Sequence, residues 1–222
     1  MVELNRVYND DFRNYLAEFD DDMFIVSDPP YNQAYHYDEY SDNMAQKDYG
    51  YLMQDAFGDK KSIIIHYPEP TINILSKVLH NCQESVSWVY NSNTAKQSRL
   101  ITWWNCKPDF KKVGQDYKNP TDKRIAKRIA EGKKARLYDW WNINQVKNVS
   151  KKHSHPCPIP LELAERIILT TTEEGDTIVD PFAGSGTILI AAKKHNRNFI
   201  GFEISKEYCD MAEKRLSQEV LL

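Results

Sequence analysis

The sequence predicts a doubly wound α/β fold whose central sheet is mostly parallel. Short apolar runs, several of them rich in β-branched residues, alternate along the chain with segments of helical periodicity. Hydrophobic residues make up 41% of the 222 residues, which can fill the core of one domain. The pattern is most regular in the last third of the chain. We therefore expect a single domain that spans residues 1–222.

Five strands are expected in the first half of the chain. Each is a short run with β-forming residues, and they cover residues 6–9, 23–27, 62–66, 85–90 and 100–104. Helices are expected at residues 11–19, 48–57 and 71–81. Residues 105–120 are expected to form a loop.

A basic helix is expected at residues 121–135, with Thr121 as its N-cap and Gly132 weakening its end. Ile125 and Ile129 form a narrow apolar stripe, which we expect to dock on the core. In the last third, helices are expected at residues 161–171, 188–194 and 206–219. The strands between them are expected at residues 177–180 and 198–203.

The composition argues against several classes of protein. No apolar run is long enough to span a membrane, and no apolar stretch follows the charges of the N-terminus, so we expect neither a span nor a signal peptide. The four cysteines are scattered without a CxxC pair, which argues against a zinc site and a disulfide scaffold and suits a cytoplasmic protein. They are Cys82, Cys106, Cys157 and Cys209. We expect no metal.

Charge is segregated along the chain although the net charge is only −3. Residues 1–60 carry a net −10, residues 61–160 a net +11 and residues 161–222 a net −4. A basic block of this kind is typical of a protein that binds a polyanion. From charge alone, a solvated basic surface explains it equally well.

A glycine-containing turn follows the strand expected at 177–180. Residues 180–187 read DPFAGSGT and lead into a helix, so that backbone and free N–H groups can approach a ligand. Glu203 ends the next strand, 17 residues beyond Gly186, where nucleotide-binding folds place an acid that binds ribose hydroxyls. No GK[ST] is present, so this is no P-loop. A purely structural turn is the alternative.

The second motif is Asp28-Pro29-Pro30-Tyr31, directly after the strand at 23–27. Two prolines stiffen the backbone and remove two N–H donors. An Asp followed by such carbonyls offers only acceptors, which suits an NH₂ group with two hydrogens to donate. Tyr31 adds a flat face on which a base can stack. Taken alone, this string is no more than a turn with a capping Asp.

Together the two motifs resemble those of the DNA amino-methyltransferases, which modify adenine N6 or cytosine N4. Residues 28–31 match the catalytic motif of that family, residues 180–187 its cofactor loop, and GFEIS at 201–205 the strand with the ribose-binding acid. The catalytic motif comes first here, as in the beta class. The resemblance covers nearly the whole chain. It implies a circularly permuted, seven-stranded methyltransferase sheet with a basic recognition segment inserted at about 105–150.

The resemblance also implies a reaction. The cofactor would be S-adenosylmethionine, and the partner double-stranded DNA with a base flipped out. Adenine N6 is the expected target, because cytosine N4 enzymes usually have Ser where this chain has Asp28. An N4-cytosine enzyme remains an alternative, as do an RNA or protein amino-methyltransferase and an inert nucleic-acid-binding module. A companion restriction enzyme, a homodimer and the DNA sequence recognised are left open.

The site residues follow from the matched positions. The expected catalytic residues are Asp28, Pro29, Pro30 and Tyr31. The expected cofactor-binding residues are Asp11, Asp28, His155, Pro156, Asp180, Phe182, Ala183, Gly184, Ser185, Gly186, Thr187 and Glu203. Asp10 competes with Asp11. The segment at His155 lacks the lysine that the family commonly has there.

DNA binding is expected in the basic segment. Residues 107–136 hold 11 Lys or Arg against 4 Asp or Glu. Lys123, Arg124, Lys127 and Arg128 share one face of the expected helix and would contact phosphates. Sequence specificity would then rest on neighbours such as Trp140, Trp141 and Asn142.

Overall fold

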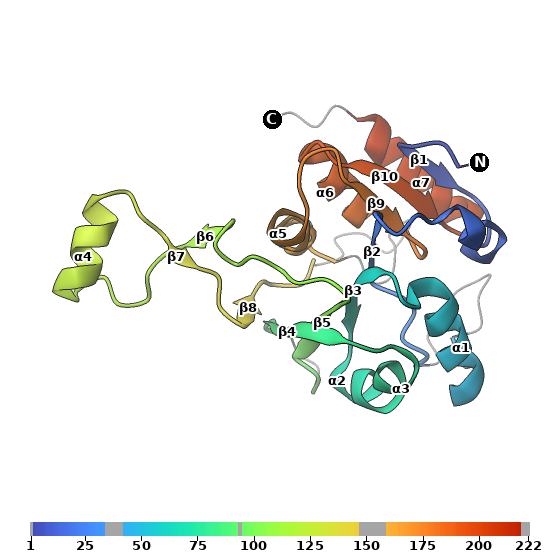
Figure 1. Cartoon of the computed structure of the whole chain (residues 1–222), viewed down its shortest axis with the longest axis horizontal. Helices are drawn as coiled ribbons and strands as arrows, with labels where there is room; N and C mark the ends of the chain where they lie inside the picture. Colours follow the sequence, from blue (N-terminus) through green and yellow to red (C-terminus); the bar gives the residue numbers. More distant parts are fainter. Residues whose placement is uncertain (1, 34–41, 93–94, 147–158, 219–222) are drawn as a thin grey trace.

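The computed structural model describes residues 2–33, 42–92, 95–146 and 159–218, and a single large sheet forms its centre (Figure 1). Within these ranges the sheet has eight strands in the order β1-β10-β9-β2-β3-β5-β4-β8. Their bounds are Arg6–Tyr8 for β1, Phe24–Ser27 for β2, Lys61–His66 for β3, Cys82–Val89 for β4, Ser98–Trp104 for β5, Trp140–Asn142 for β8, Thr177–Asp180 for β9 and Asn198–Phe202 for β10.

The sheet is mostly parallel, as expected. β1, β10, β9, β2 and β3 run parallel to one another, and β5 is antiparallel to both of its neighbours. The described sheet has one strand more than the seven expected, because β8 adds to the edge, parallel to β4. The indole N–H of Trp88 helps to hold this edge by donating to the carbonyl of Ile143 at 2.7 Å.

Helices cover both faces of the sheet. The 3₁₀ helix η1 (Phe12–Glu18), α1 (Gln46–Phe57) and the consecutive turns α2 (Pro68–Pro70), η2 (Thr71–Leu75) and α3 (Ser76–Val78) lie on one face. The other face carries α5 (Leu161–Thr171), α6 (Thr187–Lys194) and α7 (Lys206–Ser217). The helix expected at 71–81 ends at Val78, because the chain becomes extended at Leu79 and turns at Asn81 with a φ of 64°.

Two apolar cores result, one on each face. Successive strand side chains point to opposite faces, so the buried β3 residues divide between them. Ile63 and Ile65 pack with α5 and α6, whereas Ile64 packs with α1 and η2. This arrangement is the doubly wound fold that the sequence predicts.

The order of the strands reverses between β9 and β2. The chain moves from β9 to β10 on one side and from β2 to β3 on the other, while β9 and β2 are parallel neighbours. In open α/β sheets, ligands bind beyond the carboxyl ends of the strands at such a switch point. Asp28 and Asp180 lie there.

Residues 106–139 form an arm that extends away from the sheet (Figure 1). Its two short strands, β6 (Gly114–Gln115) and β7 (Ala135–Arg136), pair antiparallel, and the helix α4 (Lys123–Ala130) lies beyond them. β6 falls in the stretch expected to be loop.

Two expectations about this helix are wrong. Asp122, not Thr121, caps α4, because its Oδ1 accepts from the N–H groups of Arg124 at 2.8 Å and Ile125 at 3.3 Å. α4 does not dock on the core: it has no buried residue, and Ile129 is 44% exposed. The arm carries the helix beyond the reach of the sheet.

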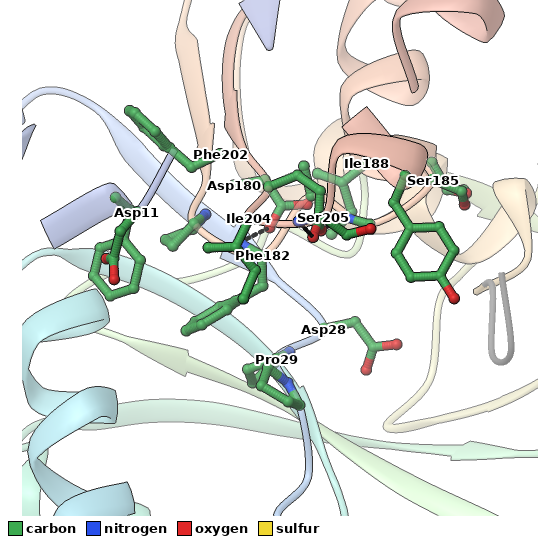
Figure 2. A pocket seen from close by; sticks show the side chains of 18 of the residues that line it. Asp11, Asp28, Pro29, Asp180, Phe182, Ser185, Ile188, Phe202, Ile204 and Ser205 are labelled. Atoms are coloured by element: carbon green, nitrogen blue, oxygen red, sulfur yellow. Dashed lines mark hydrogen bonds between the residues drawn. The ribbon is translucent and has the colours of Figure 1, made fainter. Parts of the chain in front are cut away.

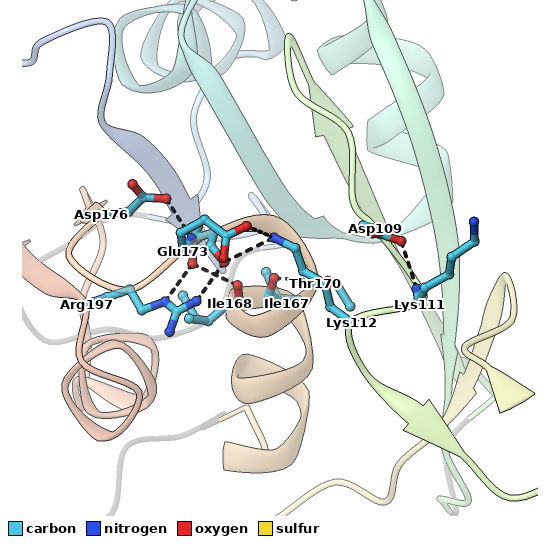
Figure 3. Close-up of polar contacts among 10 residues, drawn as sticks. Asp109, Lys111, Lys112, Ile167, Ile168, Thr170, Glu173, Asp176 and Arg197 are labelled. Atoms are coloured by element: carbon cyan, nitrogen blue, oxygen red, sulfur yellow. Dashed lines mark hydrogen bonds and ion pairs between the residues drawn. The ribbon is translucent and has the colours of Figure 1, made fainter. Parts of the chain in front are cut away.

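The base of the arm is tied to α5 and the turn after it, as Figure 3 shows. The N–H of Asp109 donates to the carbonyl of Thr170 at 2.7 Å, and Lys112 pairs with Glu173 at 2.6 Å. Phe110 packs edge-on against Trp103 and Trp141, each with ring centroids 6.2 Å away. The arm therefore starts from a fixed point on the domain.

The described ranges contain neither a membrane-spanning helix nor a candidate metal cluster. No helix there is long and apolar enough to cross a membrane. No group of three or more His, Cys, Asp or Glu residues in that part of the chain is placed to hold a metal ion. Cys157 lies outside the described residues.

Candidate active site

The two motifs, far apart in the sequence, meet at the ends of neighbouring strands. Asp28 follows β2 and Asp180 ends β9. The hydroxyl of Ser27 donates to Asp180 Oδ1 at 2.6 Å across 153 positions of sequence, and the N–H of Phe182 donates to the same oxygen at 3.1 Å. Asp180 therefore links the catalytic segment to the glycine loop.

One cavity is lined by both segments (Figure 2). All four residues of the expected catalytic motif line it. The expected cofactor-binding residues along its wall are Asp11, Asp28, Asp180, Phe182, Ala183, Gly184, Ser185, Thr187 and Glu203. Nothing is described of His155 and Pro156, which lie outside the described residues.

Gly186 is the one described residue of that expected set that does not line the cavity. Its φ is 77°, and a Cβ placed on it would lie 2.9 Å from the Cβ of Ala212 on α7. The absence of a side chain at this position lets the loop and α7 pack closely. Gly184, with a φ of 50°, is the glycine of the loop that faces the cavity.

The carboxylate of Glu203 is held by two backbone donors. Gly184 N–H donates to its Oε2 at 2.8 Å, and Ser205 N–H donates to its Oε1 at 2.9 Å. These bonds fix the acid beside the glycine loop, at the edge of the cavity. A carboxylate oxygen can accept more than one hydrogen bond, so Glu203 keeps acceptor capacity for a ligand.

The structure separates Asp11 from its competitor. Asp11 lines the cavity and caps η1, its Oδ1 accepting from the N–H of Arg13 at 2.9 Å. Asp10 instead accepts from Asn14 at 2.9 Å and from the hydroxyl of Tyr15 at 3.0 Å, and it is not among the lining residues.

The cavity has an apolar wall and an acidic wall. Phe12 and Phe182 meet edge to face with ring centroids 5.2 Å apart, beside Leu52. Asp28 and Asp180 provide carboxyl groups nearby, and burial raises the pKa of Asp28 to about 6 and that of Asp180 to about 7. A buried carboxylate is stabilised by a nearby cation.

Asp28 has two partners that lower its pKa against the effect of burial. The hydroxyl of Tyr31 donates to its Oδ1, and a guanidinium nitrogen of Arg99 lies 3.7 Å from its Oδ2. Sequence reasoning missed Arg99, which comes from β5. An isolated arginine in a strand gives no signal of the loop that it meets.

The loop of residues 28–31 is also held by α1 and β3. The hydroxyl of Tyr49 donates to the carbonyl of Pro30 at 2.7 Å and lies 2.6 Å from His66 Nε2. Burial lowers the pKa of His66 to about 3, so the ring is neutral. Because the proton of Tyr49 is directed to Pro30, Nε2 of His66 carries the hydrogen of the second bond.

Two further residues that sequence reasoning missed support the loops. Arg215 on α7 donates to Ser185 Oγ at 3.0 Å and to Thr187 Oγ1 at 3.2 Å. Asp42 accepts from the backbone of Asn32 at 2.7 Å and fixes the turn after Tyr31. Neither belongs to a recognisable motif.

The basic residues expected to contact DNA lie on the arm. Lys123, Arg124, Lys127 and Arg128 are all exposed on α4, away from the cavity (Figure 1). The neighbouring tryptophans differ: Trp140 is 41% exposed, with Lys118 Nζ 4.2 Å from its ring centroid, whereas Trp141 is buried in the core. A surface role for Trp141 is therefore excluded.

A doubly wound sheet with a cavity at the switch point, a glycine loop and a strand-end acid defines the class of Rossmann-like nucleotide-binding proteins. A family model described as DNA methylase (N6_N4_Mtase) matches residues 23–214, and the chain belongs to this family. The family uses S-adenosylmethionine.

The chain is also similar to individual members of this family. It is 45% identical to the type II methyltransferase M2.DpnII of Streptococcus pneumoniae over 96 residues, 43% of this chain and 35% of that protein. It is 28% identical to the type II methyltransferase M.BglII of Bacillus subtilis, with 97% of this chain and 70% of that protein covered.

Solved structures share the fold. The crystal structure of the M1.HpyAVI–SAM complex has a TM-score of 0.64 at 22% identity and covers 96% of this chain and 99% of its own. The PvuII DNA methyltransferase, which is cytosine-N4-specific, has a TM-score of 0.67 at 19% identity. The match covers 97% of this chain and 87% of that enzyme. The fold is thus shared by an enzyme of N4 specificity.

Proposed function

We propose that this chain transfers a methyl group from S-adenosylmethionine to the N6 amino group of an adenine flipped out of double-stranded DNA. The observation that carries the proposal is the meeting of Asp28-Pro29-Pro30-Tyr31 with the glycine loop in one cavity. Family membership supports DNA as the acceptor. Asp28 in place of the Ser usual in cytosine N4 enzymes supports adenine over cytosine.

The residues of the cavity fit the cofactor. The edge-to-face pair of Phe12 and Phe182 offers an apolar surface for a purine ring, and Asp11 also lines the cavity. Glu203, anchored by two N–H groups, is placed to accept from ribose hydroxyls. The carboxyl groups of Asp28 and Asp180 favour a cationic sulfonium in the same cavity.

The residues of this chain hold and orient the target amino group. When bound, the cofactor supplies a methyl group that its sulfonium already activates. Asp28 and the carbonyl of Pro29 accept one hydrogen each from the target NH₂. These bonds draw the nitrogen toward sp³ geometry and make its lone pair available. Tyr31 stacks on the base and offsets part of the few kcal/mol that flipping costs.

DNA contact outside the cavity falls to the arm. The four exposed cations of α4 track phosphates, and residues at about 105–150 form the recognition segment of a single domain. This role fits the position of the arm, which is anchored at its base and free of the core at its helix. A homodimer stays a prediction, for which sedimentation is the test.

The test is to identify the acceptor and the product. The purified chain is incubated with tritiated S-adenosylmethionine and, in parallel, with double-stranded DNA, RNA and a protein mixture. Labelled DNA is then digested to nucleosides. We expect label in DNA, in N6-methyldeoxyadenosine. N4-methyldeoxycytidine would overturn the choice of base, and label in RNA or protein alone would overturn the choice of substrate.

A further inference from the structure

We propose that Arg99 is a positioning residue that acts as the counterion of Asp28 and keeps its carboxylate ionised for the target amino group. The inference rests on the proposed function, in which Asp28 accepts a hydrogen bond from that group. Arg99 belongs to none of the family motifs in the sequence, and it reaches the catalytic loop from β5, which lies beyond β3 in the sheet.

Arg99 and Asp28 form a buried ion pair. The side chain of Arg99 is 4% exposed and that of Asp28 15%, with 3.7 Å between Nη1 and Oδ2. Because water is largely excluded, the pair interacts more strongly than an exposed one. Without Arg99, burial would drive the carboxyl group of Asp28 toward its protonated form. A protonated Asp28 would lose acceptor capacity at the atom that the reaction needs.

Four aromatic rings surround the cation. The guanidinium carbon of Arg99 lies 4.8 Å from the ring centroid of Tyr31, 5.1 Å from that of Trp88, 5.4 Å from that of Tyr67 and 6.0 Å from that of Tyr90. Aromatic faces attract such a cation when it is desolvated. One side chain therefore contacts both the acid and the aromatic ring of the catalytic motif.

Arg99 also has an unsatisfied donor. Nε of Arg99 is buried and, within the described part of the chain, has no hydrogen-bond partner. A buried donor without a partner costs stability, and an apolar side chain of similar volume would pack there without that cost. Packing alone therefore does not account for an arginine at this position, whereas its charge does.

Other charged or titratable groups also face Asp28. Tyr31 comes from its own loop, and Asp180 lies across the cavity on β9 with Glu203 beyond it. The neutral His66 ends β3, and Tyr67 follows it. Lys96 Nζ lies 4.6 Å from the ring centroid of Tyr67. Asp180 opposes the charge of Asp28 when it is ionised. Within the described ranges, Arg99 is the cation in ion-pair contact with Asp28.

The experiment titrates Asp28 directly, without any acceptor. The chain is labelled with carboxyl-¹³C aspartate, and the Asp28 signal is assigned by its loss in Asp28→Asn. We expect Arg99→Gln and Arg99→Met, two neutral variants of different polarity, each to raise the midpoint of Asp28 by about 1–3 pH units. Arg99→Lys restores a charge, and we expect a smaller rise. Arg197→Gln, which also removes a buried guanidinium but at the far end of β10, is the matched control.

Methyl transfer supplies the second readout. The acid limb of kcat/KM against pH should move upward in Arg99→Gln and Arg99→Met in step with the titration, and stay in place in Arg197→Gln. An unchanged Asp28 midpoint in the two neutral variants overturns the pairing. A midpoint that moves while the acid limb does not overturns the positioning role. If the wild-type chain methylates no acceptor, the proposed function fails, and the titration still decides the pairing.

Discussion

The surroundings of Asp28 shift its pKa in opposite directions, and its role depends on the balance between them. Burial favours its neutral form, while Tyr31 and Arg99 favour the carboxylate. Pro30 is anchored through Tyr49, so the loop is stiff on the side away from the cavity. This arrangement holds an acceptor at a fixed point, which is what the proposed chemistry requires.

The first prediction concerns that acceptor. Asp28→Ala should lower methyl transfer by at least about 100-fold, because removing one such contact commonly costs that much or more. Cofactor binding, measured by calorimetry, should weaken far less than turnover, and the thermal midpoint should fall because the buried Arg99 loses its counterion. A variant that keeps more than roughly a tenth of wild-type turnover would show that Asp28 does not hold the amino group.

The second prediction concerns the cofactor wall. Glu203→Ala should weaken binding of S-adenosylmethionine. The ribose hydroxyls lose their hydrogen-bond acceptor, and the N–H of Gly184 loses the carboxylate oxygen to which it donates. Gly184→Val should do the same, since a branched side chain at a φ of 50° is strained and blocks the approach of the ligand. Calorimetric titration measures both. Gly175→Val, at an exposed turn that also has a positive φ, of 87°, controls for strain alone. Unchanged affinity in both variants would rule this loop out.

At the scale of elements, α4 differs from the other helices of eight or more residues in the described chain, all of which bury side chains. It carries no buried residue, and its neighbours in space are those of the arm (Figure 1). A helix of eight residues with four cations on exposed positions gains little stability from the core, so its surface is available to a partner. Its separation from the cavity suits a helix that holds DNA at a distance from the reacting base.

The third prediction concerns this helix. Replacing Lys123, Arg124, Lys127 and Arg128 by Gln should flatten the slope of log affinity against log salt by up to about 3–4 units, because each phosphate contact contributes roughly −0.9. Binding should weaken for all DNA sequences alike. Fluorescence anisotropy at several salt concentrations measures the slope. A matched variant with Arg6, Lys47, Lys77 and Lys214 replaced by Gln should keep it. An unaltered slope in the α4 variant would mean that these four side chains do not contact the phosphates of DNA.

At the scale of the whole molecule, the joint between β2 and β9 unites the two halves of the sheet. Asp180 lies on this joint, accepts from Ser27 and Phe182, and is buried. Burial raises its pKa to about 7 from 3.8. A carboxyl group whose pKa is raised by folding stabilises the folded state most at pH values below its pKa in the unfolded state. That stability is lost as the pH rises through its pKa in the folded state.

The fourth prediction follows from this sign. Between pH 4 and 8 the free energy of unfolding should fall, with Asp180 contributing up to about 4 kcal/mol of the loss. Asp180→Asn keeps an oxygen that accepts from Ser27 but cannot ionise, so its stability should depend less on pH. Urea unfolding at several pH values measures the difference. Equal pH dependence in the two proteins would mean that Asp180 is ionised at low pH in the folded state.

The motifs and the strand pattern could be predicted from the sequence because they depend on local chemistry. Prolines after an apolar run end a strand, and glycines between a strand and a helix mark a close turn. Asp28, Gly184 and Glu203 were located on this basis, and the structure brings them to one cavity. The charge of the basic segment could likewise be counted from the residues alone.

Tertiary structure alone decided which residues support these motifs and where the basic helix lies. Arg99, Tyr49 and Arg215 reach the site from β5, α1 and α7, and contacts across a sheet leave no periodic signal in the sequence. The apolar stripe of α4 predicted docking, but β6 and β7 carry the helix past the core. Periodicity tells which face of a helix is apolar; the path of the chain determines whether the core is within its reach.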